Sequence, residues 1–168
     1  MPTEANPSMV KRSSADKAAP REAIASDFDF AATGRRVIDV EARGLAEIAG
    51  RIDGAFTAAC RALLACEGRI ACSGMGKSGH IARKIAATLS STGTPAFYIH
   101  PGEAGHGDLG MVTDADVVLA LSNSGETDEL LMLLPVLKRQ GNLLVAMTGR
   151  PGSTLATTAD IHLDVSVP

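Results

Sequence analysis

The stretch CSGMGKSG, residues 72–79, combines three glycines with Lys77 and Ser78, which are residue types suited to holding an anion. It matches two nucleotide-binding templates in part. The Walker template fails because its first glycine would stand where the chain has Ala71. The dinucleotide template lacks the acidic residue expected about 20 positions further on. What remains is a tight glycine turn in which the backbone at Gly76 and the Ser78 hydroxyl can bind an anion at a helix N-terminus.

A second stretch, SNSGET at residues 122–127, places three small hydroxyl side chains beside a glycine, again between a predicted strand and a predicted helix. These hydroxyls, with free backbone amides, suit a phosphate monoester. The hydroxyl residues are Ser122, Ser124 and Thr127. Ordinary N-capping by Ser124 or Thr127 is the alternative, and it would need only one hydroxyl.

One acidic residue lies in this second loop and another follows it, and the two have different interpretations. If Ser124 is the N-cap, a capping box would need Glu or Gln at position 127, so neither acid completes the box. Glu126 is then part of the loop. Glu129 falls near the first helical turn, where a carboxylate favours the helix dipole or takes part in a site. Lys77 at a helix start opposes that dipole, which favours a functional role for it.

A third polar stretch, HPGEAGHGDLG at residues 100–110, carries His100, Glu103, His106 and Asp108 directly after a predicted strand. Such a loop is either an exposed turn or part of a site. His80 and His162 are interpreted as structural.

Short apolar runs alternate with helical patterns from Gly68 onward, and residues 34–66 have helical spacing that Gly50 and Gly54 divide into two helices. Two further helices are predicted, around residues 78–91 and 127–140, and Pro135 should bend the second or remove one of its hydrogen bonds. Gly93 and Gly141 are candidate C-terminal caps. The runs predict five buried strands, at residues 69–73, 96–100, 116–121, 143–147 and 161–165.

This alternation predicts an α/β fold with a doubly wound, five-stranded parallel sheet. In the flavodoxin-like strand order 2-1-3-4-5, the loops after strands 1 and 3 are neighbours at the topological switch point, where ligands of open α/β folds bind. The first two polar loops would then serve one small phosphorylated ligand.

Composition narrows the function classes. A net charge of -3 and only four Phe and one Tyr argue against a nucleic-acid partner. The three cysteines lack a C-x-x-C spacing, and no apolar run has the length of a membrane span, so we expect a cytoplasmic protein without a membrane partner. Residues 1–27 have the composition of a disordered tail, which leaves residues 28–168 as one folded domain.

Several separated motifs together resemble the SIS (sugar isomerase) domain of arabinose 5-phosphate isomerases. They are GMGKSGHIARKIAATLSSTGTPAFYIHPGEAGHGDLGM, SNSGE, PVLKR, TGRPGS and AD.HL, in that order. The resemblance implies interconversion of D-ribulose 5-phosphate and D-arabinose 5-phosphate through an enediolate, for the synthesis of Kdo and lipopolysaccharide. It also implies a homo-oligomer, specifically a tetramer, with a sugar phosphate as its small-molecule partner.

The resemblance carries site roles onto matching positions. It implies catalytic roles for Lys77, Glu129 and His106. The resemblance implies an enzyme that requires no cofactor, but it makes His100 a candidate ligand of a divalent metal such as zinc. The substrate-binding positions that it implies are Gly76, Ser78, Gly93, Thr94, His100, His106, Ser122, Ser124 and Thr127.

The sequence departs from the family pattern after Pro168. Family members continue with a catalytic glutamate, a long apolar helix, a catalytic histidine and usually a pair of CBS domains. We therefore expect a C-terminally truncated domain without that helix or the CBS pair, and without turnover of its own. A sugar-phosphate-binding SIS module without catalysis is the alternative function. A dinucleotide-binding oxidoreductase fragment is disfavoured by Lys77 and His100.

Overall fold

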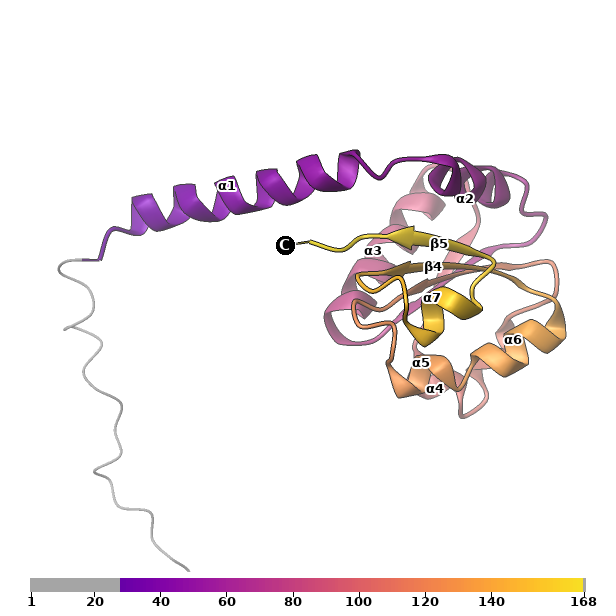
Figure 1. Cartoon of the computed structure of the whole chain (residues 1–168). Helices are drawn as coiled ribbons and strands as arrows, with labels where there is room; N and C mark the ends of the chain where they lie inside the picture. Colours follow the sequence, from indigo (N-terminus) through magenta and orange to yellow (C-terminus); the bar gives the residue numbers. More distant parts are fainter. Residues whose placement is uncertain (1–27, 168) are drawn as a thin grey trace, which may run out of the picture. The chain divides into compact units, whose positions relative to one another are not determined.

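The computed structural model describes residues 28–167, so the predicted tail at residues 1–27 lies outside the described part of the chain. Helices and strands alternate through most of it (Figure 1). The elements are α1 (Phe30–Ala49), α2 (Gly54–Leu64), β1 (Ile70–Gly74), α3 (Gly76–Ser91), β2 (Ala96–Ile99), α4 (Pro101–Ala104), the 3-10 helix η2 (Asp108–Met111), β3 (Val117–Leu121), α5 (Asp128–Leu131), α6 (Leu134–Gln140), β4 (Leu143–Thr148), α7 (Thr154–Thr158) and β5 (Ile161–Asp164).

The described residues divide into two units, residues 28–40 and 41–167. The first contains the N-terminal part of α1, where Asp29 Oδ1 accepts a hydrogen bond from Ala32 N at 2.8 Å. The second contains the rest of α1, the sheet and the remaining helices. No helix among residues 28–167 is both long enough and apolar enough to cross a membrane.

The five strands form one parallel sheet in the order β2-β1-β3-β4-β5, which confirms the predicted order. In the register, Ile70 lies opposite Ala96 on one side and Val117 on the other. Both β1 and β3 are buried along their whole length, as expected for central strands of a sheet that is covered on two faces. The strand ends fall within one residue of the predicted ends.

Helices cover both faces of the sheet and make two apolar cores. One core joins Ala59 of α2 and Ala82 of α3 to side chains such as Cys72 and Leu119. The other joins Leu130, Leu137 and Leu155, from α5, α6 and α7, to the opposite face. The packing of α5, α6 and α7 along one side of the sheet is visible in Figure 1.

The predicted helix boundaries have clear local causes. Residues 34–66 form two helices, as expected, although α1 begins earlier, at Phe30. Asp53 begins α2 by accepting hydrogen bonds from Ala55 N at 2.8 Å and Phe56 N at 3.4 Å. Pro135 splits the predicted helix over residues 127–140 into α5 and α6, because it has no N–H to continue the ladder.

Of the two glycines predicted as C-terminal caps, one occupies the capping position. Gly141 follows α6 in the left-handed conformation, with φ 84°, and so acts as the predicted cap. Gly93 also has a positive φ, of 97°, but Thr92 takes the capping position of α3 and Gly93 follows it.

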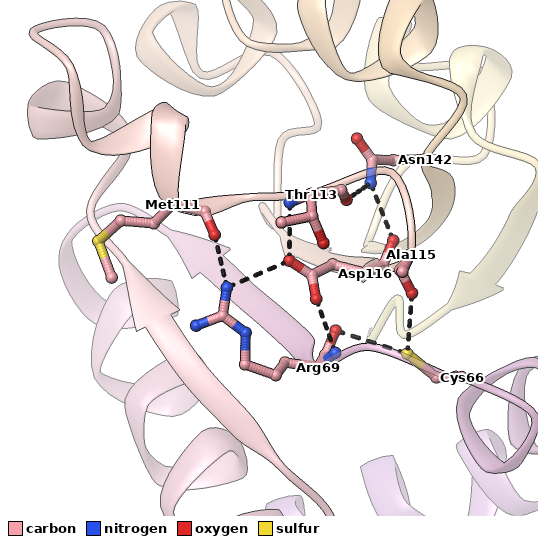
Figure 2. Close-up of polar contacts among 7 residues, drawn as sticks. All are labelled: Cys66, Arg69, Met111, Thr113, Ala115, Asp116 and Asn142. Atoms are coloured by element: carbon pink, nitrogen blue, oxygen red, sulfur yellow. Dashed lines mark hydrogen bonds and ion pairs between the residues drawn. The ribbon is translucent and has the colours of Figure 1, made fainter.

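A buried carboxylate organises the turns at the amino-terminal edge of the sheet (Figure 2). Asp116 Oδ1 accepts a hydrogen bond from Arg69 N at 2.7 Å, and its Oδ2 accepts one from Thr113 N at 2.8 Å. The Arg69 guanidinium lies 3.4 Å from Oδ2, and Asn142 Nδ2 donates to the carbonyl of Asp116 at 2.9 Å. These contacts tie the starts of β1, β3 and β4 together at the edge opposite the candidate loops.

Candidate functional site

The glycines of the 72–79 stretch allow close packing at the end of β1. A Cβ on Gly74 would lie 2.8 Å from the Leu121 carbonyl oxygen of β3, and a Cβ on Gly79 would lie 2.6 Å from the Gly74 carbonyl oxygen. Gly76, the first residue of α3, has a φ of +54°, a conformation that favours glycine. The glycine spacing therefore follows from the joining of strand to helix and requires no nucleotide.

The loops after β1 and β3 meet at one cavity of about 260 Å³ at the carboxyl edge of the sheet. Lys77 is exposed and Ser78 half-buried in the first turn of α3, whose N-cap residue, Met75, makes no side-chain capping bond. Lys77 is the charged residue of the cavity lining, which favours an anionic ligand. The lining residues are Lys77, Ser78, Ile81, Leu121, Ser122, Asn123, Met147 and Val165.

Three hydroxyls of the second loop form one hydrogen-bonded cluster. The Ser122 hydroxyl lies 2.9 Å from the Thr127 hydroxyl and 3.4 Å from that of Ser124, and it accepts a hydrogen bond from Gly125 N at 3.0 Å. The Ser124 hydroxyl accepts one from Glu126 N at 3.2 Å. Ser122 is buried, whereas Ser124 and Thr127 are half-buried.

These contacts do not support simple capping as the role of the loop. Thr127, not Ser124, occupies the N-cap position of α5, and its side chain makes no capping bond. Of the two capping alternatives, Ser124 is excluded because the helix begins three residues later than a cap at Ser124 would require. Glu126 remains in the loop, as predicted, and its carboxylate Oε1 accepts a hydrogen bond from Thr154 N at 2.7 Å.

The other residues proposed as catalytic lie outside the cavity lining. Glu129 is half-buried in the first turn of α5. His106 is exposed in the turn between α4 and η2. Because α4 packs against α5, the His100–His106 loop and Glu129 belong to neighbouring elements on the same side of the sheet. Their catalytic roles stay predictions.

His100 carries the metal prediction. It ends β2 and precedes α4, and its Nδ1 is buried without a hydrogen-bond partner. A free imidazole nitrogen is a suitable zinc ligand. However, no group of three or more His, Cys, Asp or Glu side chains in the described part of the chain could hold a metal. Residues 28–167 offer His100 as a single ligand, and the zinc site stays a prediction.

Gly93 and Thr94 lie between α3 and β2, at the amino-terminal edge of the sheet. The Thr94 N–H donates to the Leu89 carbonyl at 2.9 Å, which ties this turn to the end of α3. Gly93 and Thr94 therefore do not line the cavity at Lys77 of their own chain. The geometry of this cavity does not explain the contact with substrate that was predicted for them. His162 has the structural role predicted for it, since its Nε2 lies 2.9 Å from the Thr148 hydroxyl.

Sequence reasoning missed Asn123, which lines the cavity. Its carbonyl accepts a hydrogen bond from Gly149 N at 3.0 Å, and a Cβ on Gly149 would lie 2.6 Å from the Asn123 side-chain oxygen. Gly149, the first glycine of TGRPGS, was the available signal, since the loop after β4 approaches the loop after β3 at this residue.

Comparisons with known proteins agree with this arrangement. An SIS domain model matches residues 63–168. Arabinose 5-phosphate isomerase KdsD of Yersinia pestis is 56% identical over 140 residues, which are 83% of this chain and 43% of that protein. KdsD of Pseudomonas aeruginosa is 52% identical over 144 residues, 86% of this chain and 44% of that one. The chain thus spans less than half the length of these curated relatives.

A solved structure, E. coli CFT073 c3406 in complex with A5P, is similar with a TM-score of 0.73 and 41% identity. The similarity covers 84% of this chain and 77% of that one. Because the family model matches more than half of the chain and the similarity to this structure covers 84% of it, the chain belongs to the SIS domain family.

Proposed function

We propose that this chain carries the sugar-phosphate site of an aldose-ketose isomerase that interconverts D-ribulose 5-phosphate and D-arabinose 5-phosphate. The observation that carries the proposal is the position of Lys77 and the 122–127 hydroxyl loop beside one cavity. The names of the KdsD relatives and the A5P bound to c3406 support the choice of substrate.

In this proposal the second loop binds the phosphate. The Ser124 and Thr127 hydroxyls, which lie on the same loop outside the cavity lining, and the Ser78 hydroxyl, which belongs to the lining, donate hydrogen bonds to its oxygens. The exposed ammonium of Lys77 adds the positive charge that a phosphate or a developing enediolate oxygen requires. The buried Ser122 hydroxyl holds the loop in shape and is a less direct contact.

Isomerisation moves a proton between C1 and C2 of the sugar. A base removes the proton from the carbon beside the carbonyl, the enediolate forms, and an acid returns a proton to the other carbon while the hydroxyl proton is transferred between the oxygens. We assign the acid and base functions to Glu129 and His106, with Lys77 stabilising the negative oxygen. Zinc at His100 would polarise the carbonyl if the remaining ligands come from elsewhere.

A sugar-phosphate-binding module without turnover is a second candidate. It is favoured by one observation: apart from Lys77, no acidic or basic side chain is among the residues that line the cavity. Such a module would bind the sugar phosphate through the same hydroxyls and would not exchange its protons.

A proton-exchange assay separates these two functions. D-arabinose 5-phosphate is incubated with the chain in D2O, and NMR follows loss of the C2 proton signal and formation of D-ribulose 5-phosphate. Turnover that Lys77→Ala abolishes supports the isomerase. Saturable binding without exchange shows that this chain by itself acts as a binding module, in agreement with the expectation that it lacks turnover of its own, and absence of both contradicts the two proposals.

We also propose that the protein is a cytoplasmic homotetramer that supplies Kdo synthesis. The free state of Cys60, Cys66 and Cys72 supports a reducing compartment. Large apolar side chains that remain exposed, among them Leu64 and Ile81, support an assembly. The KdsD relatives support the pathway.

A further inference from the structure

We propose that Glu126 is a positioning residue, whose carboxylate fixes the 122–127 loop on the first turn of α7 and thereby sets the geometry of the Ser122 and Ser124 hydroxyls. The proposal depends on the proposed function only for the identity of the ligand that these hydroxyls bind.

The loop supplies two of the acceptors for the first turn of α7. Glu126 Oε1 accepts a hydrogen bond from Thr154 N at 2.7 Å, and the Gly125 carbonyl accepts one from Leu155 N at 3.1 Å. The helix's own N-cap, Ser153, supplies the next acceptor, to Ala156 N at 3.3 Å. The first three amides of a helix have no partner within it, so here the loop completes the helix.

Steric fit fixes the same joint. Gly125 has a φ of +66°, and a Cβ on it would lie 2.0 Å from the Ser153 hydroxyl oxygen. The turn of the loop therefore rests directly on the N-cap of α7, and a side chain at this position would force the loop away.

The two residues that contact α7 also hold the hydroxyls. Gly125 N donates to the Ser122 hydroxyl at 3.0 Å, and Glu126 N donates to the Ser124 hydroxyl at 3.2 Å. A single residue thus links α7 to each hydroxyl: Gly125 to that of Ser122 and Glu126 to that of Ser124. A shift of the Glu126 backbone would move the Ser124 hydroxyl directly.

A carboxylate beside a phosphate site needs an explanation, because two anions repel. The hydrogen bond from Thr154 N lowers the pKa of Glu126, and the nearby positive charge of Arg150 lowers it further. The charge is thus directed at the N-terminus of α7, where a negative charge is favourable. The positioning role needs the acceptor oxygen, and the negative charge is dispensable for binding.

Three variants isolate the contact. Glu126→Ala removes the acceptor, whereas Glu126→Gln keeps an acceptor oxygen and removes the charge. Thr154→Pro removes the backbone donor together with the threonine hydroxyl, the two groups of Thr154 that hydrogen-bond Glu126. The helix should tolerate it, because proline is accepted at the first helical position and Ser153, with φ -73° and ψ 159°, already has the backbone conformation preferred before proline. Glu67→Ala, at an exposed acid between α2 and β1, is the matched control.

Calorimetric titration of the full chain with D-arabinose 5-phosphate is the first measurement. Glu126→Ala and Thr154→Pro should each weaken binding about tenfold, and the double variant no further, because both break one contact. The affinity of Glu126→Gln for the sugar phosphate should stay within about twofold of the wild-type value, as should that of Glu67→Ala. Wild-type affinity in Glu126→Ala, additive effects in the double variant, or equal losses for Gln and Ala would overturn the proposal.

Amide hydrogen exchange without ligand is the second measurement. Glu126→Ala should speed exchange at Leu155 and Gly125 while the melting temperature changes little. Unchanged exchange at both amides would overturn the proposal, as would a lower melting temperature with unchanged affinity. If the wild type binds no sugar phosphate, the proposed function fails, and the exchange data still decide whether Glu126 holds the loop.

Discussion

At the scale of single residues, the buried and half-buried hydroxyls of the second loop have separable roles. Ser124→Ala removes a predicted phosphate donor and should weaken sugar-phosphate binding about tenfold or more, because a hydrogen bond to a charged group contributes about 1.5–3 kcal/mol. Its stability should change little, since Ser124 is half-buried. Titration and thermal melting check both quantities.

Ser122→Ala should lower the free energy of unfolding as well. Its hydroxyl accepts from Gly125 N at 3.0 Å and lies 2.9 Å from the Thr127 hydroxyl, and both contacts are lost in the variant. Gly125 N keeps the Ser122 carbonyl as an acceptor at 3.1 Å, so the cost should be about 1 kcal/mol. Equal melting temperatures for the two serine variants would show that Ser122 does not organise the loop.

Lys77→Ala tests the cation of the site. Lys77 is exposed at the start of α3, so the free energy of unfolding should change by no more than about 0.5 kcal/mol. Affinity for the sugar phosphate should fall about tenfold, because a charge-assisted contact is lost. Lys84→Ala, at an exposed lysine further along the same helix, is the control. A variant that binds as tightly as the control would make Lys77 an ordinary surface lysine.

Residue types and spacing predicted that Lys77 and the hydroxyl loop lie at the same edge of the sheet, and Lys77 and Ser122 do line one cavity there. The binding roles of these residues stay predictions. Residue types and spacing could not predict the partner of Glu126. That partner is the backbone N–H of Thr154, 28 residues further along the chain. Nearly every residue type has a backbone N–H, so the sequence does not indicate which one donates.

At the scale of elements, the Asp116 network holds the edge of the sheet that faces away from the site. Asp116→Ala should lower the free energy of unfolding by about 3 kcal/mol, because it leaves the amides of Arg69 and Thr113 without their acceptor. Asp114→Ala, at an exposed acid of the same turn, should change it by less than about 0.5 kcal/mol. Denaturant unfolding at neutral pH measures both.

The same network predicts a dependence on pH. Burial by itself raises the pKa of Asp116, but the hydrogen bonds from Thr113 and Arg69, together with the Arg69 charge, outweigh it and leave the pKa below its ordinary value. The stabilisation is therefore fully present above the ordinary carboxyl pKa of about 4 and is lost as the pH falls below it. Between about pH 5 and pH 2, the wild type should lose more stability than Asp116→Asn does. Parallel pH profiles would contradict this account.

The strands and the break at Pro135 could be predicted because each has a local cause: buried apolar runs that alternate with helical patterns, and an imino acid without an N–H. The start of α5 could not. Three hydroxyls precede it, each able to cap a helix, and the choice of Thr127 depends on how the loop packs against Ser153 and Gly149.

At the scale of the whole molecule, exposed apolar side chains predict self-association. Among the residues from Glu41 onward, Leu64 is 85% exposed, Met132 65% and Ile81 55%. Large apolar side chains that gather on a surface mark contacts with other protein chains. Sedimentation velocity should therefore show an oligomer, and Ile81→Ser or Leu64→Ser should shift it toward smaller species. A stable monomer that binds no hydrophobic dye would contradict this prediction.

We expect the cavity at the carboxyl edge of the sheet to bind a sugar phosphate and not a dinucleotide. Calorimetric titration of the chain with D-arabinose 5-phosphate and, separately, with NAD distinguishes the two ligands. The sugar phosphate should bind saturably, this binding should be lost in the Lys77→Ala, Ser124→Ala double variant, and NAD should not bind. Binding of NAD, or sugar-phosphate affinity unchanged in the double variant, would contradict this expectation.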